Sequence, residues 1–269
     1  MNKGFVILAQ NTDTVNYLEC AEALAISMKK VMPNCNITLI SNQSSMCNEF
    51  DNVVELPYGD LAEHSDWKLI NDWQVYEASP YDYTIKLEAD MYVPADIEYW
   101  FDILKDRDIN VCTTIRDYKN EISNCRVYRR FIDDNKLPDV YNAITYFRKS
   151  DTASYFFKLV RDIFENWDDY KKTLVCDVDE QVTTDWAYSI ACHIMGIENT
   201  TMPLTGFSMV HMKQFVNNLR TPDWTNELVY EFTEPMRINM FTQKYPVHYH
   251  VKEFGKKIKD KYGRNETVL

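Results

Sequence analysis

Short, near-continuous apolar segments alternate with helical patterns through the first half of the chain. The first apolar segment, residues 4–9 (GFVILA), is followed by apolar residues at helical spacing over 15–32. Residues 67–78 also have a helical pattern. Four later apolar segments predict strands, at 37–40, 53–56, 83–87 and 110–115. Strands that are apolar throughout and separated by helices are typical of βαβ units, so this half predicts an α/β fold with a mainly parallel sheet flanked by helices.

The second half has a more mixed pattern. Residues 141–147 (YNAITYF) predict a strand, and apolar residues over 153–167 predict a strongly amphipathic helix. Apolar residues at 187, 190, 191 and 194 predict another helix, which ends before Gly196. The last part of the chain contains prolines at 203, 222, 235 and 246. Because proline interrupts helices, this part is expected to form loops and short strands that make an irregular C-terminal extension.

Composition adds that the chain is an acidic protein of ordinary globular type. Hydrophobic residues make up 45% and charged residues 26% of its 269 residues, and the formal net charge is −12. A net negative charge argues against nonspecific binding to nucleic acid. The C-terminal stretch 252–269 differs, because it holds six Lys or Arg and three Asp or Glu residues. This basic tail is a candidate contact for an anionic partner.

Cysteine usage and the N-terminal sequence favour a reducing compartment. The seven cysteines include no Cys-x-x-Cys pair, so neither a zinc site nor a disulfide framework is expected. No apolar run approaches the ~18 residues of a membrane span, and residues 1–10 lack the cleavage pattern of a secretory signal. We therefore expect a cytoplasmic protein without a membrane span.

The sharpest chemical feature is a pair of acidic residues at the end of a predicted strand. Residues 86–94 read KLEADMYVP, which places Glu88 and Asp90 two positions apart after the apolar segment. In open α/β sheets, ligands bind beyond the carboxyl ends of the strands. Two carboxylates there can hold Mg²⁺ or Mn²⁺, which accept oxygen ligands and substrate phosphates. The alternative is a polar turn without a ligand, since two acids at this spacing are common.

Glu88-Ala89-Asp90 resembles the Asp-x-Asp motif of the GT-A-fold glycosyltransferases. The resemblance is closest to their family 8, glycogenin-like group and to sugar transferases of tailed phages. In the family, the motif binds the metal that bridges the diphosphate of a nucleotide sugar. Asp90 matches the directly coordinating position, whereas Glu88 departs from the family's aspartate and could instead contact the ribose or a water.

The resemblance implies a single GT-A-like, Rossmann-related domain over residues 1–269. Its fold would be a mixed, mainly parallel sheet flanked by helices, with the irregular C-terminal extension added. The implied parts are a nucleotide-binding half, an acceptor-side half and the extension with its basic tail, at 1–120, 121–221 and 222–269.

The same resemblance assigns further residues to the donor nucleotide sugar. Residues 5–11 (FVILAQN) resemble the family's first strand, whose carboxyl end receives the nucleobase and ribose. The positions at that end are Ala9, Gln10, Asn11 and Thr12. Lys68 lies in a segment that resembles one directing a basic residue toward the phosphates. Residues 141–150 resemble the segment that places Asn142 against the donor sugar, although Ile144 stands where the family often has glycine. A core strand with a polar cap and a solvated lysine are the structural alternatives.

An acidic residue near the reacting sugar carbon is also implied by the resemblance. The matching segment is 177–186 (DVDEQVTTDW), at the start of a predicted helix. Asp185 is the first candidate for this catalytic role, and Asp179 or Glu180 is the second. An acid in the first turn of a helix also stabilises the helix dipole without any catalytic role, so both interpretations stay open.

Family 8 enzymes end with a histidine that completes the metal site and a lysine that binds the diphosphate. Two segments of this chain offer His-x-Lys, at 211–213 and 250–252. Alternate residues of a strand point to one face, so each His and its Lys can reach one phosphate. We favour His211 as the metal ligand with His250 close behind, and assign Lys213 or Lys252 to the diphosphate. His248 shares a face with His250 and is also a candidate.

Together these residues imply a metal-dependent glycosyltransferase. It would use Mn²⁺ or Mg²⁺ and move a sugar from a nucleoside diphosphate sugar, with UDP-sugar favoured, to an acceptor hydroxyl. Retention of the anomeric configuration is favoured by the resemblance. The acceptor would be a glycan or, given the phage resemblance and the basic tail, a hydroxymethylated pyrimidine in phage DNA. In the second case the protein would act in the host cytoplasm.

Two alternatives come from other classes of protein. One is a catalytically weak protein that binds a sugar nucleotide or a glycan. The other is a nucleotidyltransferase, which the sequence favours less. Such enzymes have a glycine-rich loop after the first strand, whereas this chain has Gln10, Asn11 and Thr12 there and only six glycines in all.

Overall fold

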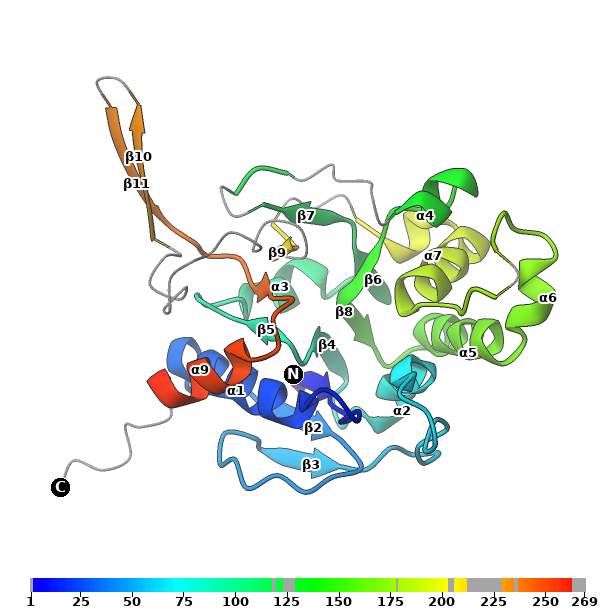
Figure 1. Cartoon of the computed structure of the whole chain (residues 1–269), viewed down its shortest axis with the longest axis horizontal. Coiled ribbons are helices and arrows are strands. Elements are labelled where there is room, and N and C mark those ends of the chain that lie inside the picture. Colours follow the sequence, from blue (N-terminus) through cyan, green and yellow to red (C-terminus); the bar gives the residue numbers. More distant parts are fainter. Residues whose placement is uncertain are drawn as a thin grey trace.

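The computed structural model describes residues 2–117, 120–122, 129–177, 179–202, 206–211, 229–234 and 237–262. Its centre is a six-stranded sheet with the strand order β3-β2-β1-β4-β8-β6 (Figure 1). The strands are β1 Lys3–Leu8, β2 Ile37–Ile40, β3 Asn52–Val54, β4 Tyr83–Glu88, β6 Ile109–Cys112 and β8 Tyr141–Arg148. The first four are parallel, whereas β8 is antiparallel to β4 and β6. The predicted mixed, mainly parallel sheet is confirmed.

Helices cover both faces of this sheet. They are α1 Tyr17–Val31, the 3-10 helix η1 Lys68–Gln74, α2 Val75–Ala78, α3 Tyr99–Leu104, α4 Arg130–Asp134, α5 Asp151–Glu165, α6 Trp167–Lys171, α7 Thr184–Met195, α8 Ile197–Thr200 and α9 Phe254–Tyr262. Strand β1 explains the two layers, because alternate residues point to opposite faces. Phe5 packs in the apolar cluster that contains α1 and α3, and Val6 packs in the cluster that contains α5 and α7. None of the described helices is both long and apolar enough to cross a bilayer.

A smaller four-stranded sheet brings the C-terminal part of the chain to the end of β4. Its order is β5-β12-β9-β7, with the strands β5 Met91–Tyr92, β7 Thr114–Arg116, β9 Ser208–His211 and β12 Val247–His248. Strand β5 follows β4 after a two-residue turn, and β12 pairs with it directly. A two-stranded hairpin, β10 Val229–Glu234 and β11 Arg237–Thr242, projects from one end of the molecule (Figure 1).

Three predicted elements differ in detail from the structure. The single strand expected over 110–115 is divided into β6 and β7, because the register with β8 shifts between Val111 and Cys112 and the chain then enters the smaller sheet. The helix expected over 67–78 is mostly the 3-10 helix η1, whose buried Asn71 and Gln74 side chains bond the backbone of the preceding loop. Helix α9 follows the last proline and packs on α1. The six cysteines described are free thiols.

Candidate functional site

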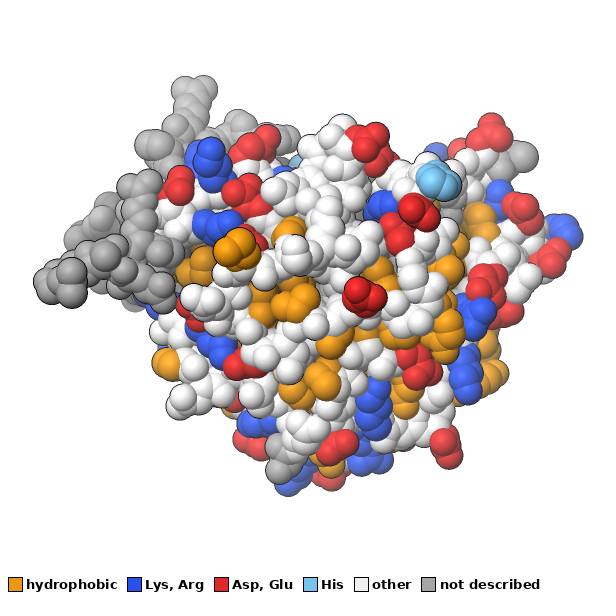
Figure 2. All heavy atoms as spheres, turned by 90° about the horizontal axis from the view of Figure 1, so that it is seen from below, with side chains coloured by type: hydrophobic (Ala, Val, Ile, Leu, Met, Phe, Trp, Pro, Cys, Tyr) orange, Lys and Arg blue, Asp and Glu red, His pale blue; other side chains and the backbone are white. Residues whose placement is uncertain are grey.

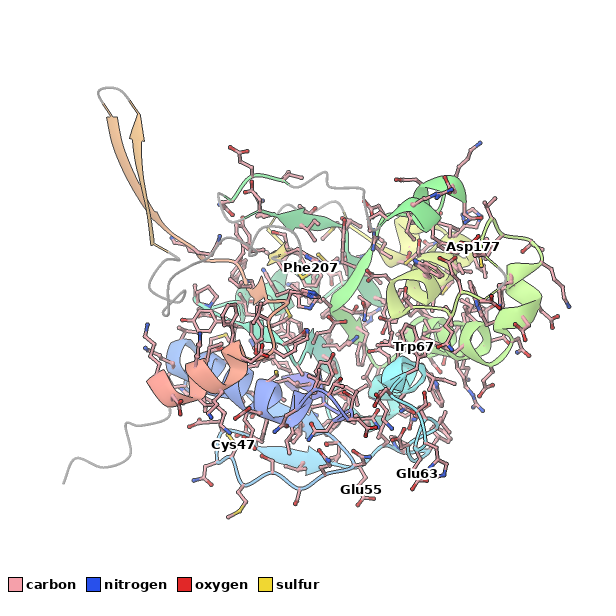
Figure 3. The ribbon with its side chains drawn as sticks, viewed as in Figure 1. Cys47, Glu55, Glu63, Trp67, Asp177 and Phe207 are labelled. Carbon is pink, nitrogen blue, oxygen red and sulfur yellow. The ribbon has the colours of Figure 1, made fainter. Side chains whose placement is uncertain are left out.

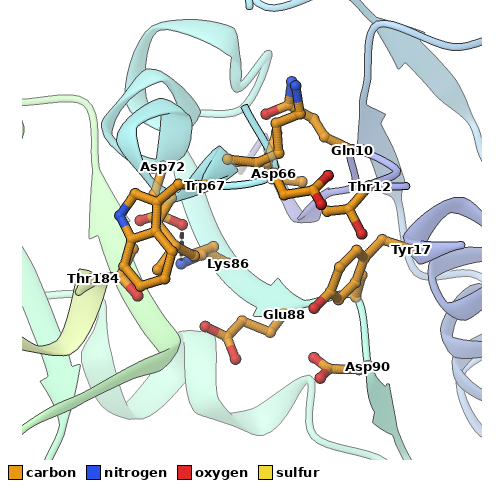
Figure 4. Close-up of a pocket in the computed structure, with 14 residues that line it drawn as sticks. Gln10, Thr12, Tyr17, Asp66, Trp67, Asp72, Lys86, Glu88, Asp90 and Thr184 are labelled. Carbon is orange, nitrogen blue, oxygen red and sulfur yellow. Dashed lines mark ion pairs between the residues drawn. The ribbon is translucent and has the colours of Figure 1, made fainter. Parts of the chain in front are cut away.

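Two adjoining cavities lie at the carboxyl ends of β1 and β4. The first, of about 290 Å³, is lined by the end of β1, the start of α1, η1 and β4 (Figure 4). The second, of about 420 Å³, lies against the starts of β8 and α7 and against β12. The residues that line both are Tyr17, Trp67, Leu69, Glu88 and Thr184. The two cavities therefore make one candidate site, in the position where open α/β sheets bind ligands.

Two carboxylates and one imidazole meet between these cavities. Glu88 is the last residue of β4, and Asp90 lies in the turn to β5. His248 Nε2, on β12, lies 3.2 Å from Glu88 Oε2 and 3.3 Å from Asp90 Oδ2. Ligand atoms of the three residues all lie within 4.8 Å of one another. Carboxylate oxygens and an imidazole nitrogen suit Mn²⁺ or Mg²⁺, so this donor set fits the ion that the sequence predicts.

Lys252 brings a second cation to the same carboxylates. Its Nζ contacts Asp90 Oδ2 and lies 5.5 Å from the centre of the Tyr17 ring. Burial alone would raise the pKa of Asp90, but His248 and Lys252 hold that pKa below its ordinary value. Burial would lower the pKa of His248, but Asp90 and Glu88 raise it, which favours the imidazolium. We call Glu88, Asp90, His248 and Lys252 the edge cluster.

A buried arginine fixes Asp185, the acid predicted to be catalytic. Asp185 lies in the first turn of α7, where its Oδ2 accepts from Arg129 Nη1 at 2.7 Å and its Oδ1 accepts from the Asn142 backbone N–H at 2.9 Å. Arg129 is 1% exposed and also donates to Asp139 Oδ1 at 2.6 Å. Its guanidinium lies 4.2 Å from the centre of the Tyr141 ring. Asp185 is therefore held in one orientation on the wall of the second cavity.

Asn142 links this arginine network to the edge cluster. Its backbone N–H bonds Asp185, and its side-chain Nδ2 donates to Glu88 Oε1 at 2.9 Å. The residue is 3% exposed and lies near the start of β8. A single asparagine thus connects the acid at the end of β4 with the acid at the start of α7, on the wall of the second cavity.

Strand β4 also carries a lysine in its buried part. Lys86 is 1% exposed, and its Nζ lies 2.5 Å from Asp72 Oδ1 on η1 and 3.4 Å from the Asn142 carbonyl oxygen. Asp72 Oδ2 accepts from the Tyr188 hydroxyl at 2.6 Å. Burial raises the pKa of Tyr188 well above its ordinary value, so Tyr188 stays a donor. Lys86 and Asp72, the buried pair, both line the first cavity (Figure 4).

The residues predicted to receive the nucleobase lie at the end of β1 as expected, but they face different surroundings. Gln10 and Thr12 line the first cavity. Ala9 is buried in the core, and Asn11 Oδ1 accepts from the Leu18 backbone N–H of α1 at 2.9 Å. Their contact with a nucleotide stays a prediction.

Lys68 and Trp67 form another side of the first cavity. The Lys68 Nζ donates to Asp60 Oδ2 at 2.9 Å and to the Ala62 carbonyl at 2.5 Å, which ties it to the loop before η1. Its predicted reach toward phosphates stays a prediction. Trp67 is 38% exposed and lies close to η1 (Figure 3), with its Nε1 donating to the Val182 carbonyl at 3.2 Å.

The structure brings His248, rather than His211 or His250, against the two carboxylates. Strand β5 follows Asp90, and β12 is paired directly with β5, whereas β9 lies one strand further away. His211, on β9, is opposite His248 with its ring centre 5.1 Å away. His250 lies beyond the end of β12, and both His211 and His250 line the second cavity. Lys213 lies outside the described residues. Geometry thus favours His248 as the ligand.

Asp179 and Glu180 lie apart from Asp185. They line a third cavity of about 540 Å³, which also includes Trp67. Three residues of the site, Arg129, Lys86 and Asp72, were not found by sequence reasoning. Lys86 had a signal, since it is a charged residue inside an apolar segment (YTIKL). Arg129 had none, because its importance depends on a carboxylate 56 positions away.

The comparisons with known proteins concern the fold. No family profile and no curated protein matches the chain. The crystal structure of the galactosyltransferase LgtC with donor and acceptor sugar analogues matches with a TM-score of 0.57 at 12% identity, covering 99% of this chain and 97% of that chain. A second LgtC structure, of an active-site mutant, matches with a TM-score of 0.56 at 13% identity and the same coverage. The chain therefore has a GT-A-type glycosyltransferase fold.

Proposed function

We propose that the protein is a metal-dependent glycosyltransferase. It transfers a sugar from a nucleoside diphosphate sugar, with UDP-sugar favoured, to an acceptor hydroxyl. The observation that carries the proposal is the edge cluster, because two carboxylates and a histidine converge at the carboxyl edge of the sheet in a glycosyltransferase fold. The likeness of fold supports the reaction class, and the cluster supports the need for a divalent ion.

Glu88, Asp90 and His248 are the residues that would hold Mn²⁺ or Mg²⁺. Bound there, the ion supplies Lewis-acid neutralisation of the diphosphate's negative charge. Lys252, already at Asp90, adds a positive charge near the place where the leaving diphosphate gains negative charge. Gln10 and Thr12 would contact the nucleoside at the far side of the first cavity, and the other residues at the end of β1 would support them.

The transfer itself breaks the bond between the anomeric carbon and a diphosphate oxygen, and forms a bond from that carbon to the acceptor oxygen. Positive charge develops on the sugar ring as the leaving group departs. Asp185 faces the second cavity with both of its oxygens already accepting hydrogen bonds, from Arg129 and Asn142. We assign Asp185 to electrostatic stabilisation of the reacting sugar, and the acceptor's proton passes to the departing diphosphate oxygen. Retention of configuration is the favoured outcome in this proposal.

The acceptor we favour is a glycan hydroxyl rather than a base in DNA. The third cavity, next to Trp67, is lined by five acidic residues and one lysine: Glu165, Asp168, Asp169, Asp179, Glu180 and Lys171. Such a surface repels a phosphate backbone. On the face shown in Figure 2, acidic and basic side chains are interspersed. In the basic tail, Lys259 pairs with Glu22 of α1, which uses one of its charges within the protein.

Thermal unfolding with and without nucleotides tests the proposal. UDP, GDP, ADP and CDP are each added with and without Mn²⁺ to wild type and to Asp90→Asn. A ligand at ~100 times its dissociation constant adds ~2.7 kcal/mol of stability. We expect a Mn²⁺-dependent rise in Tm with UDP that Asp90→Asn loses. No rise with any nucleotide would contradict the proposal. Slow hydrolysis of the UDP-sugar without acceptor then separates an enzyme from a binding protein.

A further inference from the structure

The buried pair places two full charges in the wall of a cavity. Lys86 is 1% and Asp72 is 6% exposed, yet both line the first cavity. Taking charged groups out of water is costly, and replacing a buried ion pair by apolar side chains is often neutral or stabilising. Stability alone therefore gives a weak reason for a lysine and an aspartate at these positions.

The pair retains hydrogen-bonding capacity for a ligand. A lysine ammonium carries three hydrogens, and Lys86 has two acceptors in the described part of the chain, Asp72 Oδ1 and the Asn142 carbonyl. Each carboxylate oxygen can accept about two hydrogen bonds, and Asp72 Oδ2 accepts one from Tyr188. The pair thus offers a donor and acceptors side by side, which matches the donor and acceptor character of a sugar hydroxyl.

The position of the pair fits the sugar of a bound donor. Lys86 and Glu88 are two residues apart on β4 and so project from the same face of the sheet. Lys86 Nζ lies 3.4 Å from the carbonyl oxygen of Asn142, whose backbone N–H bonds Asp185. A diphosphate held at the edge cluster would therefore place its attached sugar between Lys86 and Asp185, where the two cavities adjoin. Trp67, which lines the same cavity, offers an apolar ring to the C–H groups of a sugar (Figure 4). Gln10 and Thr12 line the part of this cavity near the end of β1, which leaves the part near Lys86 for the sugar.

We infer that Lys86 and Asp72 bind hydroxyl groups of the transferred sugar and select donors that carry a neutral sugar. This inference rests on the proposed function. The charge of Lys86 is balanced by Asp72, so the pair has no net positive charge to attract the carboxylate of a uronic acid. That carboxylate would lie next to the Asp72 carboxylate, whereas the hydroxyls of a neutral hexose can bond both members of the pair.

Binding measurements with matched ligands test the inference. Dissociation constants for UDP, UDP-glucose, UDP-galactose and UDP-glucuronate are measured by calorimetry with Mn²⁺. In wild type, we expect the better neutral UDP-hexose to bind at least ten-fold more tightly than UDP-glucuronate. In Lys86→Met/Asp72→Leu, which replaces the pair by apolar side chains of similar size, we expect the neutral donor to bind at least ten-fold more weakly, because hydrogen bonds to charged groups are lost. The affinity for UDP itself is expected to change less than two-fold.

The control is Tyr188→Phe, which removes the hydrogen bond to Asp72 but keeps both members of the pair. It is expected to change the ratio of UDP-hexose to UDP affinity less than three-fold. Equal weakening of UDP and UDP-hexose in the double variant would overturn the inference, because it indicates general damage to the site. Tighter binding of UDP-glucuronate by wild type would also overturn it, even if the double variant does not fold. If wild type showed no Mn²⁺-dependent binding of UDP, this would instead overturn the proposed function, and the inference with it.

Discussion

The edge cluster and the buried pair each join carboxylates to cations and each include a residue of β4, but the protein encloses them differently. The side chains of Lys86 and Asp72 are 1% and 8% exposed, whereas those of His248 and Lys252 are 17% and 23% exposed. The partner of Lys86 comes from η1, which is separated from β4 only by the short helix α2 and the turn after it. The cations of Asp90 come from the C-terminal part of the chain, with Lys252 162 positions away.

The core therefore holds the buried pair in place, whereas a ligand can rearrange the edge cluster. The buried pair is fixed between β4, η1 and α7, because Lys86 pairs with Asp72 and Asp72 accepts from the Tyr188 hydroxyl. The cations of the edge cluster depend on β12 pairing with β5 and on the segment that leads to α9, which packs on α1. Changes at the buried pair should therefore act first on folding and then on the sugar. Changes at the edge cluster should act mainly on metal and nucleotide, with a smaller effect on folding.

The largest effect is expected from Asp90→Asn. Loss of one carboxylate from the predicted metal site should abolish the Mn²⁺-dependent rise in Tm with UDP. It should also lower the rate of UDP-sugar hydrolysis about 10³-fold, or ~4 kcal/mol, because charge stabilisation by a bound ion is worth several kcal/mol. Asp102→Asn, an exposed residue of α3, is the matched control and should behave as wild type. If Asp90→Asn kept the hydrolysis rate within ten-fold of wild type, the edge cluster would not be the metal site.

The next largest effect is expected from Lys86→Met, which breaks the buried pair. Lys86→Met leaves Asp72 with a buried, unpaired charge, and breaking a buried pair in this way costs about 3–5 kcal/mol. We expect a loss near 3 kcal/mol in the free energy of unfolding, because the first cavity lets water approach. The double variant Lys86→Met/Asp72→Leu should recover most of it. Denaturant unfolding of both variants measures this, and a double variant as unstable as the single one would show that the pair itself stabilises the fold.

The same contrast explains what could be predicted from the sequence. Glu88 and Asp90 were found because their signal is local: an apolar strand followed by two acids marks the carboxyl edge of a parallel sheet. The sheet itself was predicted for the same reason, from runs of consecutive apolar residues. Lys86 has a local signal too, since a lysine interrupts one of these runs.

Residues whose placement depends on distant pairing could not be predicted. The segments around His211 and His250 have the same local pattern, and nothing in either one indicates that β12 lies between β5 and β9. That strand order brings His248 to the carboxylates. Arg129 is similar, because its pairing with Asp185 and its place on the wall of the second cavity both depend on the folded chain.

A smaller effect is expected from the titration of His248. Asp90 and Glu88 raise its pKa in the protein without metal, so the imidazole must lose a proton before it can bind an ion. The affinity for Mn²⁺ should then rise about ten-fold per pH unit while His248 is protonated, and level off above its pKa. Calorimetric titration of Mn²⁺ at pH 6, 7 and 8 measures this slope. His248→Gln should bind more weakly and lose most of the slope, whereas an unchanged slope would exclude His248 as the ligand.

The smallest effect should come from charges that belong to neither group. Lys256 and Lys257 are exposed on α9, and Lys257 Nζ lies 5.4 Å from the centre of the Phe254 ring. Their replacement by glutamine should lower the free energy of unfolding by less than ~1 kcal/mol, the range of an exposed cation–π contact. UDP-sugar hydrolysis should change less than two-fold. If the acceptor is DNA, however, the same variant should weaken acceptor binding and reduce its salt dependence, since each lysine at a phosphate releases counterions. Binding of hydroxymethylated duplex DNA at increasing salt would therefore decide whether the basic tail belongs to the acceptor site, and unchanged binding in the variant would place it outside.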